Sequence, residues 1–228
     1  FSISVILGNG VVYCMVQSNS IAGSFSGQAE LPPLAVGVIL VALVGLVIFG
    51  GIKRLSTVAS YIVPFMAFAY IILALIVLVT HAEWIADMFR LIIDSAFGVQ
   101  QAAGGVLGYS VQEAFRYGVA RGLFSNDAGA GTTPSMHAAA NVKHPVNQGL
   151  SGMLGVFVTT IIVCSCTAFC ILLSGALNGS LTGIQLTQAA FSSSFGDLGY
   201  WLVAAAMFLF GYTTLLANMY YGEVNTRY

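Results

Sequence analysis

Residues 55–82 read LSTVASYIVPFMAFAYIILALIVLVTHA and contain no Lys, Arg, Asp or Glu. A helix needs about 20 mostly apolar residues to cross the hydrocarbon core of a bilayer, so this run is long enough to span a membrane. Other long charge-free runs lie at 1–29, 31–52, 144–196 and 198–222. These continuous apolar runs lack the alternation of apolar and polar residues that marks the strands of a membrane β-barrel. The sequence therefore predicts an all-α polytopic membrane protein.

The composition of the whole chain supports the same class. Of 228 residues, 7% are charged and 58% are hydrophobic, whereas soluble domains carry roughly 25% charged residues. So few charges could not cover the surface of a soluble enzyme, a secreted disulfide scaffold or a disordered chain. The net charge of −1 leaves no basic surface for nucleic acid. We expect the lipid bilayer as a partner and no nucleic acid.

The charge-free runs resolve into six expected spans in a single transmembrane domain over residues 1–228. They lie at 2–26, 34–51, 59–80, 85–120 (interrupted), 149–177 and 199–222. With alternating spans, six of the seven basic residues fall on one side of the membrane: Lys53, Arg54, Arg116, Arg121, Lys143 and Arg227. The positive-inside rule assigns that side to the cytoplasm. We therefore expect a protein of the cell inner (plasma) membrane, with the loops at 52–57 and 121–148 and the C-terminal end cytoplasmic.

The fourth expected span does not look like a regular helix. Residues 94–108 read DSAFGVQQAAGGVLG, which places four glycines and two glutamines at membrane depth. Glycine favours backbone that leaves the helix, and freed backbone amides persist in the membrane only where they line a cavity or are buried in protein. Broken helices of this kind point to the substrate site of a transporter. Close helix packing through small residues is the alternative interpretation.

Polar side chains in the other spans are further candidates. Gln17 could bind a small zwitterion or hydrogen-bond a neighbouring helix. Thr213 and Thr214 supply two hydroxyl oxygens, which are hard ligands suited to Na⁺, although threonines also bond back to their own helix. Arg90 and Asp94, spaced i,i+4, fit a binding role as well as a gate or an ion pair at the membrane interface.

Catalytic machinery is not visible in the sequence. Neither an H-E-x-x-H motif nor a P-loop occurs, so we expect no enzyme and no cofactor apart from Na⁺ as a coupling ion. The connecting segment 116–147 should form helices and tight turns, either as a hinge or inner gate or as a packed connector. Residues 182–195 should form a short helix at the outer side.

Residues 118–131 read GVARGLFSNDAGAG and are followed by TTPSMHAAA. Further stretches are VQSNS at 16–20, FGGIKR at 49–54, VPFM at 63–66, KHPV at 143–146 and YYGE at 220–223. Together these closely resemble the alanine/glycine:cation symporters, or sodium:alanine symporter family, over the whole chain and in the same order. That family is similar to LeuT-type transporters, which have ten core helices in two inverted repeats. The resemblance implies a LeuT-type fragment that covers about core helices 3 to 8; Phe1, already inside an apolar run, agrees with a fragment.

The resemblance also implies a function. It is the secondary active symport of a small neutral amino acid, alanine or glycine, with Na⁺ or H⁺. Na⁺ ligands are implied at Thr213 and Thr214, and substrate contacts at Gln17, Phe97, Gly98, Gln101, Gly104, Thr214 and Asn218. Three residues depart from the family pattern: Asn218 and Met219 stand where relatives usually place Trp and a small residue, and Asp127 stands where most carry Glu. A channel or facilitator and a non-transporting membrane subunit are the alternative functions.

Overall fold

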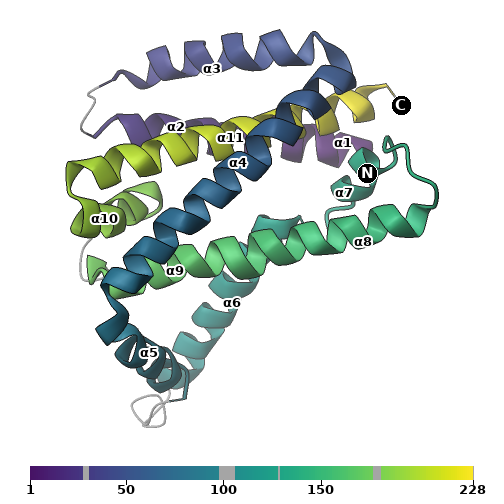
Figure 1. The fold of residues 1–228 in the computed structure, drawn as a ribbon. Coiled ribbons are helices and arrows are strands. Elements are labelled where there is room, and N and C mark those ends of the chain that lie inside the picture. The colour runs from purple at the N-terminus through teal and green to yellow at the C-terminus, as the bar shows by residue number, and fades with distance from the viewer. Residues whose placement is uncertain (28–30, 98–105, 128, 177–180, 228) are drawn as a thin grey trace. The chain divides into compact units, whose positions relative to one another are not determined.

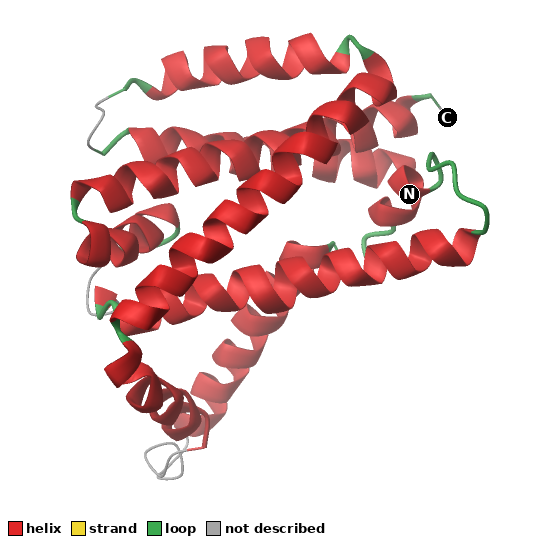
Figure 2. Cartoon of the chain, viewed as in Figure 1, coloured by secondary structure: helices red, strands yellow, loops and turns green. Residues whose placement is uncertain are grey.

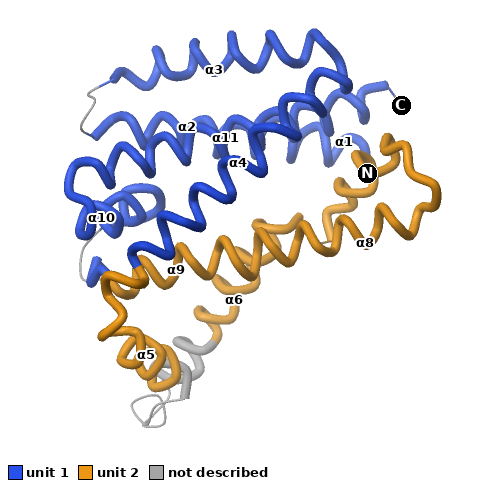
Figure 3. Tube along the Cα trace, viewed as in Figure 1, with its two compact units in different colours: residues 1–77, 174–228 blue, residues 78–173 orange. Residues whose placement is uncertain are grey.

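The computed structural model describes residues 1–27, 31–97, 106–127, 129–176 and 181–227 (Figure 1). The regular elements within these ranges are all helical, joined by short turns and loops (Figure 2). The chain divides into two compact units, residues 1–77 with 174–228 and residues 78–173 (Figure 3). The prediction of an all-α protein is confirmed for the described residues.

The first unit begins with one long helix whose middle has a different winding. The segments α1 (Ser2–Val5), η1 (Ile6–Tyr13) and α2 (Cys14–Phe25) follow one another without a break, and η1 is a π-helix. The next helix, α3 (Pro33–Ile48), starts at a proline, whose fixed φ suits the first helical position. Gly51, with φ +71°, then turns the chain into α4 (Gly51–Thr80).

The last two helices complete the first unit. A single residue, Gly196, joins α10 (Ile184–Phe195) to α11 (Asp197–Thr226). Helix α11 packs against α10, against α3 and along the first helix, as Figure 1 shows for α2. The first helix and α11 run antiparallel, because Tyr200 contacts Ser24 at one end and Gly222 faces Gly10 at the other.

The core of this unit is apolar and lies between α11 and its neighbours. Its buried residues come from α2, α3, α4 and α11: Ile21, Ala22, Val36, Leu40, Val44, Val47, Leu55, Tyr212, Leu215 and Leu216. Gly211 makes this packing possible, since an added Cβ there would lie 2.6 Å from the side chain of the fully buried Ile21. The absence of a side chain at this position lets the two helices approach closely.

The second unit has a similar long helix and several shorter ones. Its elements are η2 (Ala82–Trp84), α5 (Ile85–Phe97), α6 (Val106–Asn126), α7 (Thr132–His137), α8 (Pro145–Val156), η4 (Phe157–Val163) and α9 (Cys164–Leu173). The segments α8, η4 and α9 are continuous, and η4 is a second π-helical segment. Phe89 of α5 packs edge-on against Phe169 of α9. Ser125 of α6 lies 3.3 Å from the thiol of Cys164.

Four helices in the described residues are long and apolar enough to cross a membrane: Ser2–Phe25, Gly51–Thr80, Pro145–Leu173 and Asp197–Thr226. The apolar helix Pro33–Ile48 is shorter. Helix α4 leaves Phe65, Phe68 and Val79 exposed, as suits a surface in contact with lipid. These features support a polytopic membrane protein. Six spans and their LeuT-type numbering remain predictions.

Some expected boundaries need correction. Residues 52–57 were expected to form a loop, but α4 begins at Gly51 and includes them. Lys53 and Arg54 end an apolar run without ending a helix, because neither is a helix breaker. Likewise, residues 121–126 of the expected loop at 121–148 belong to α6. The short helix expected at 182–195 is α10, and the described residues of segment 116–147 form helices, turns and short loops.

Candidate functional site

The structure places four of the predicted site residues on two helices that pack together. Gln17 lies on α2, whereas Thr213, Thr214 and Asn218 lie on α11. Thr214 and Asn218 are one turn apart and therefore share a face of the helix. Phe97 ends α5 in the other unit. The remaining predicted substrate contacts, Gly98, Gln101 and Gly104, lie outside the described residues.

Asn218 is held by a residue that the sequence reasoning missed. Its Oδ1 accepts a hydrogen bond of 3.1 Å from Nδ2 of Asn9. Both side chains are buried, with exposed fractions of 5% for Asn9 and 3% for Asn218. A buried amide needs a hydrogen-bonding partner. The signal was present in the sequence, since Asn9 is an amide at a charge-free position between two glycines.

Asn9 lies within the π-helical segment η1. The Cys14 thiol donates a hydrogen bond of 3.3 Å to the backbone carbonyl of Asn9, five residues earlier. Next to Asn9, a Cβ on Gly10 would lie 3.6 Å from the Cα of Gly222. The backbones of η1 and α11 therefore approach closely beside the amide pair.

The two threonines bond back to their own helix. Thr213 Oγ1 donates to the carbonyls of Leu209 and Phe210 at 3.1 and 3.0 Å, and Thr214 Oγ1 donates to Phe210 at 2.8 Å. Helix α11 continues through these residues. A hydroxyl that donates its proton still has lone pairs that can bind a cation. Back-bonding, the alternative interpretation, is therefore observed, and the Na⁺ site remains a prediction.

Gln17 has an amide without a partner among the described residues. Its side chain is half-buried on α2, and no hydrogen bond joins it to another described residue. The neighbouring Ser18 and Ser20 instead donate to backbone carbonyls of their own helix at 3.1 and 2.9 Å. The interhelical hydrogen bond that we considered for Gln17 is thus not formed within the described part of the chain.

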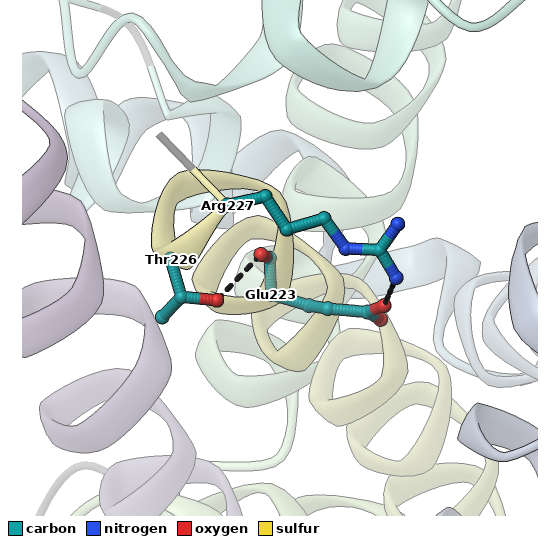
Figure 4. Close-up of polar contacts among 3 residues, drawn as sticks. All are labelled: Glu223, Thr226 and Arg227. Carbon is teal, nitrogen blue, oxygen red and sulfur yellow. Dashed lines mark hydrogen bonds and ion pairs between the residues drawn. The ribbon is translucent and has the colours of Figure 1, made fainter.

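The charged candidates are at exposed positions. The Arg90–Asp94 pair has an N–O distance of 3.5 Å, with side-chain exposed fractions of 80% and 66%. At the end of α11, Glu223 pairs with Arg227, and Thr226 Oγ1 donates to the Glu223 carbonyl at 2.7 Å (Figure 4). Glu223 and Arg227 line a cavity of about 460 Å³ beside the start of α4. Exposed pairs of this kind contribute little to stability.

The residues described between α6 and α7 include three with left-handed backbone conformations. Asp127, Gly129 and Gly131 all have positive φ, of 53°, 81° and 73°. Partial burial raises the pKa of the Asp127 carboxyl above its ordinary value. A largely apolar cavity of about 910 Å³ lies between α7 and α8, where His137 Nδ1 and Gln148 Nε2 are 2.8 Å apart.

Comparisons with known proteins match the whole chain to one family of transporters. The model of the sodium:alanine symporter family matches residues 1–228. An uncharacterized transporter of Haemophilus influenzae is 43% identical over 229 residues, which covers 100% of this chain and 48% of the relative. The probable sodium/glutamine symporter GlnT of Bacillus subtilis is 41% identical over 226 residues, with 99% and 46% covered. The sodium/proton-dependent alanine carrier protein of Bacillus sp. PS3 is 38% identical over 240 residues, with 99% and 53% covered. The chain thus spans about half the length of these curated relatives.

Proposed function

Since the chain belongs to the sodium:alanine symporter family, we propose that its protein carries out secondary active symport of a small neutral amino acid with Na⁺. Alanine or glycine is the proposed substrate, and H⁺ is the other coupling ion to test. One observation carries the proposal. The first helix and α11 pack together and bear Gln17, Thr213, Thr214 and Asn218 within charge-free segments. Neutral amides and hydroxyls can hold a zwitterion and a cation without adding net charge to the membrane.

The proposed roles follow from the chemistry of each group. Thr213 and Thr214 supply hydroxyl oxygens to Na⁺, with Thr214 also next to the substrate. Gln17 and Asn218 bind the amino acid through their amides. Backbone groups and side chains of the interrupted span complete the substrate site, from Phe97, Gly98, Gln101 and Gly104. Broken helices present backbone N–H and C=O groups to charged ligands in this way.

Coupling would let the cation gradient drive uptake. Moving one positive charge through the membrane potential is worth about 2.3 kcal/mol per 100 mV. A cation that binds together with the substrate transfers that free energy to the amino acid. We propose that the protein lies in the cell inner (plasma) membrane with the C-terminal end of α11 in the cytoplasm. The basic residues near the ends of the apolar helices support this orientation.

The names of the relatives bear on the substrate and the ion. One relative is described as a sodium/glutamine symporter and another as a sodium/proton-dependent alanine carrier. Both descriptions support cation-coupled amino-acid transport. They differ in the amino acid, so the substrate panel for this protein should contain alanine, glycine and glutamine.

The test is uptake by the natural full-length protein that contains residues 1–228, reconstituted in proteoliposomes. Labelled alanine should accumulate above its external concentration when Na⁺ is high outside, and should not accumulate when Na⁺ is equal on both sides. A facilitator would equilibrate alanine without regard to Na⁺, and a non-transporting subunit would bind without uptake. Either of these results would contradict symport.

A double variant tests the ion site. Thr213→Val with Thr214→Val keeps the side-chain shape and removes both hydroxyl oxygens. We expect the Na⁺ concentration at half-maximal uptake to rise on the order of tenfold or more, as when one or more charge-assisted contacts are lost. Thr159→Val is the matched control, because Thr159 bonds back to Gly155 and Val156 at 3.0 and 3.2 Å in a helix outside the proposed site. An unchanged Na⁺ dependence in the Thr213/Thr214 variant would refute the ion site.

A further inference from the structure

The hydrogen bond between Asn9 and Asn218 has a direction that matters for binding. A side-chain amide has one carbonyl oxygen that accepts and one NH₂ group that donates. Nδ2 of Asn9 donates to Oδ1 of Asn218, so the carbonyl of Asn218 faces Asn9. The NH₂ group of Asn218 makes no hydrogen bond to another described residue. The free end of Asn218 is therefore a donor.

The NH₂ group of Asn218 also keeps access to space outside the protein atoms. The fully enclosed side-chain atoms without a partner in the described residues are Thr132 Oγ1, Thr160 Oγ1 and Ser194 Oγ. Nδ2 of Asn218 is not among these atoms, although the side chain as a whole is only 3% exposed. A nearly buried donor without a protein partner gains free energy when a ligand supplies an acceptor.

The backbone next to the pair limits how the two amides can move. A Cβ on Gly222 would lie 3.4 Å from the Cα of Gly10, so α11 and η1 are in close contact one turn from Asn218. The extra residue of the π-helical winding alters the face of the first helix on which Asn9 lies. Asn9 thus donates to Asn218 from a backbone segment that is in close contact with α11.

We propose that Asn9 is a positioning residue, which holds the carbonyl of Asn218 so that the NH₂ group of Asn218 donates to an acceptor oxygen of the bound amino acid. This inference rests on the proposed function, in which Asn218 contacts the substrate. Without Asn9, the Asn218 amide is free to rotate, and its carbonyl oxygen can face the substrate oxygen. That arrangement is repulsive, so substrate affinity falls while the cation site keeps its ligands.

A double-mutant cycle tests this in the natural full-length protein, with alanine uptake measured at saturating Na⁺. We expect Asn9→Leu and Asn218→Leu each to raise the KM for alanine on the order of tenfold, the loss of about one hydrogen bond to a charged acceptor. The double variant should have the KM of Asn218→Leu alone, because Asn9 acts through Asn218. The Na⁺ concentration at half-maximal uptake should stay within about twofold of the wild-type value.

A matched control separates positioning from general stability. Asn225 is a buried amide on the same helix, and its Nδ2 donates to the carbonyl of Tyr221 at 2.9 Å without touching Asn218. Asn225→Leu should lower thermal stability without raising the KM for alanine. Asn9→Asp, which keeps the shape and loses the N–H donors when ionised, replaces Asn9→Leu where that variant does not fold.

The outcomes are distinct from those of the symport test. If wild-type protein shows no Na⁺-dependent uptake, the proposed function itself fails. If wild-type uptake is normal and Asn9→Leu leaves the KM for alanine unchanged, the positioning role is overturned. It is also overturned if Asn9→Leu raises the KM further in the Asn218→Leu background, since Asn9 would then act independently of Asn218.

Discussion

Among the glycines that the structure describes, Gly199 is the one whose added Cβ would lie closest to backbone atoms. Gly196 alone connects α10 to α11, with φ 61° and ψ −144°, a conformation that is essentially restricted to glycine. This tight connection presses the first turn of α11 onto the last turns of α10. A Cβ on Gly199 would lie 2.6 Å from the carbonyl carbon of Phe191, closer still to its oxygen, and 2.9 Å from the nitrogen of Ser192. These atoms belong to the backbone and cannot rotate away.

The geometry gives a magnitude for Gly199→Ala. Nonbonded carbon atoms are comfortable at about 3.5 Å, so α10 and α11 would have to separate by about 1 Å. Helix α10 resists this movement, because Gln188 Nε2 donates to the Ser24 carbonyl at 2.8 Å and the Phe191 ring is fully buried against Tyr70. Overpacking of this kind costs roughly 2–3 kcal/mol. For a chain of this size, that lowers Tm by about 4–12 °C.

The assay is thermal unfolding of the detergent-solubilised protein. The folded protein that remains after heating is measured by size-exclusion chromatography. Gly37→Ala is the matched control, since Gly37 lies inside α3 and has no atom within 4 Å of its added Cβ. Alanine is the better helix former by about 1 kcal/mol, so the control should unfold at the wild-type temperature or above. A Gly199→Ala protein that unfolds within about 1 °C of wild type would refute the close approach of α10 and α11.

Three further changes test other contacts. Tyr200→Phe removes the hydroxyl that donates to the Ser24 carbonyl at 2.8 Å, and should cost about 1 kcal/mol in thermal unfolding; Tyr61→Phe, at an exposed position, should cost nothing. Burial raises the pKa of Asp127, so the folded state keeps the proton to higher pH than the unfolded chain, and stability falls as pH rises through that range. Asp127→Asn should remove this slope and raise Tm slightly at neutral pH; an unchanged pH profile of Tm contradicts it. Arg90→Ala should change stability by less than about 0.5 kcal/mol, because its pair with Asp94 is exposed; a larger loss points to a contact beyond this pair.

Much of the helical layout could be read from the distribution of charges. The expected span at 199–222 lies within α11, and the expected span at 2–26 closely matches the first helix. The error at 52–57 has a physical cause. Lys53 and Arg54 indicate where an apolar run ends, but both residues are good helix formers. Charge therefore predicts the limits of the apolar part of a helix better than the limits of the helix itself.

The site was only partly readable because its geometry depends on contacts between distant segments. Thr213, Thr214 and Gln17 could be selected as polar residues in charge-free runs. Asn9 is a polar residue in the same kind of run, but its pairing with Asn218 could not be predicted, because the two residues are 209 positions apart and Asn9 belongs to a π-helical segment. Helical periodicity assumes i to i+4 bonding, so it misplaces the faces of a segment with i to i+5 bonding.

The absence of charge from these helices also restricts the chemistry that recognition can use. Residues 1–29 and 198–222 contain no Lys, Arg, Asp or Glu, so the polar side-chain and backbone groups that a ligand between them could meet are uncharged amides, hydroxyls, thiols and peptide groups. An amide can act as either donor or acceptor, depending on which end is free. In a charge-free interface, whether a ligand meets a donor or an acceptor therefore depends on the direction of the hydrogen bonds between the protein side chains. In the proposed site, the partner that fixes this direction, Asn9 for Asn218, would then matter for specificity as much as the residue that contacts the ligand.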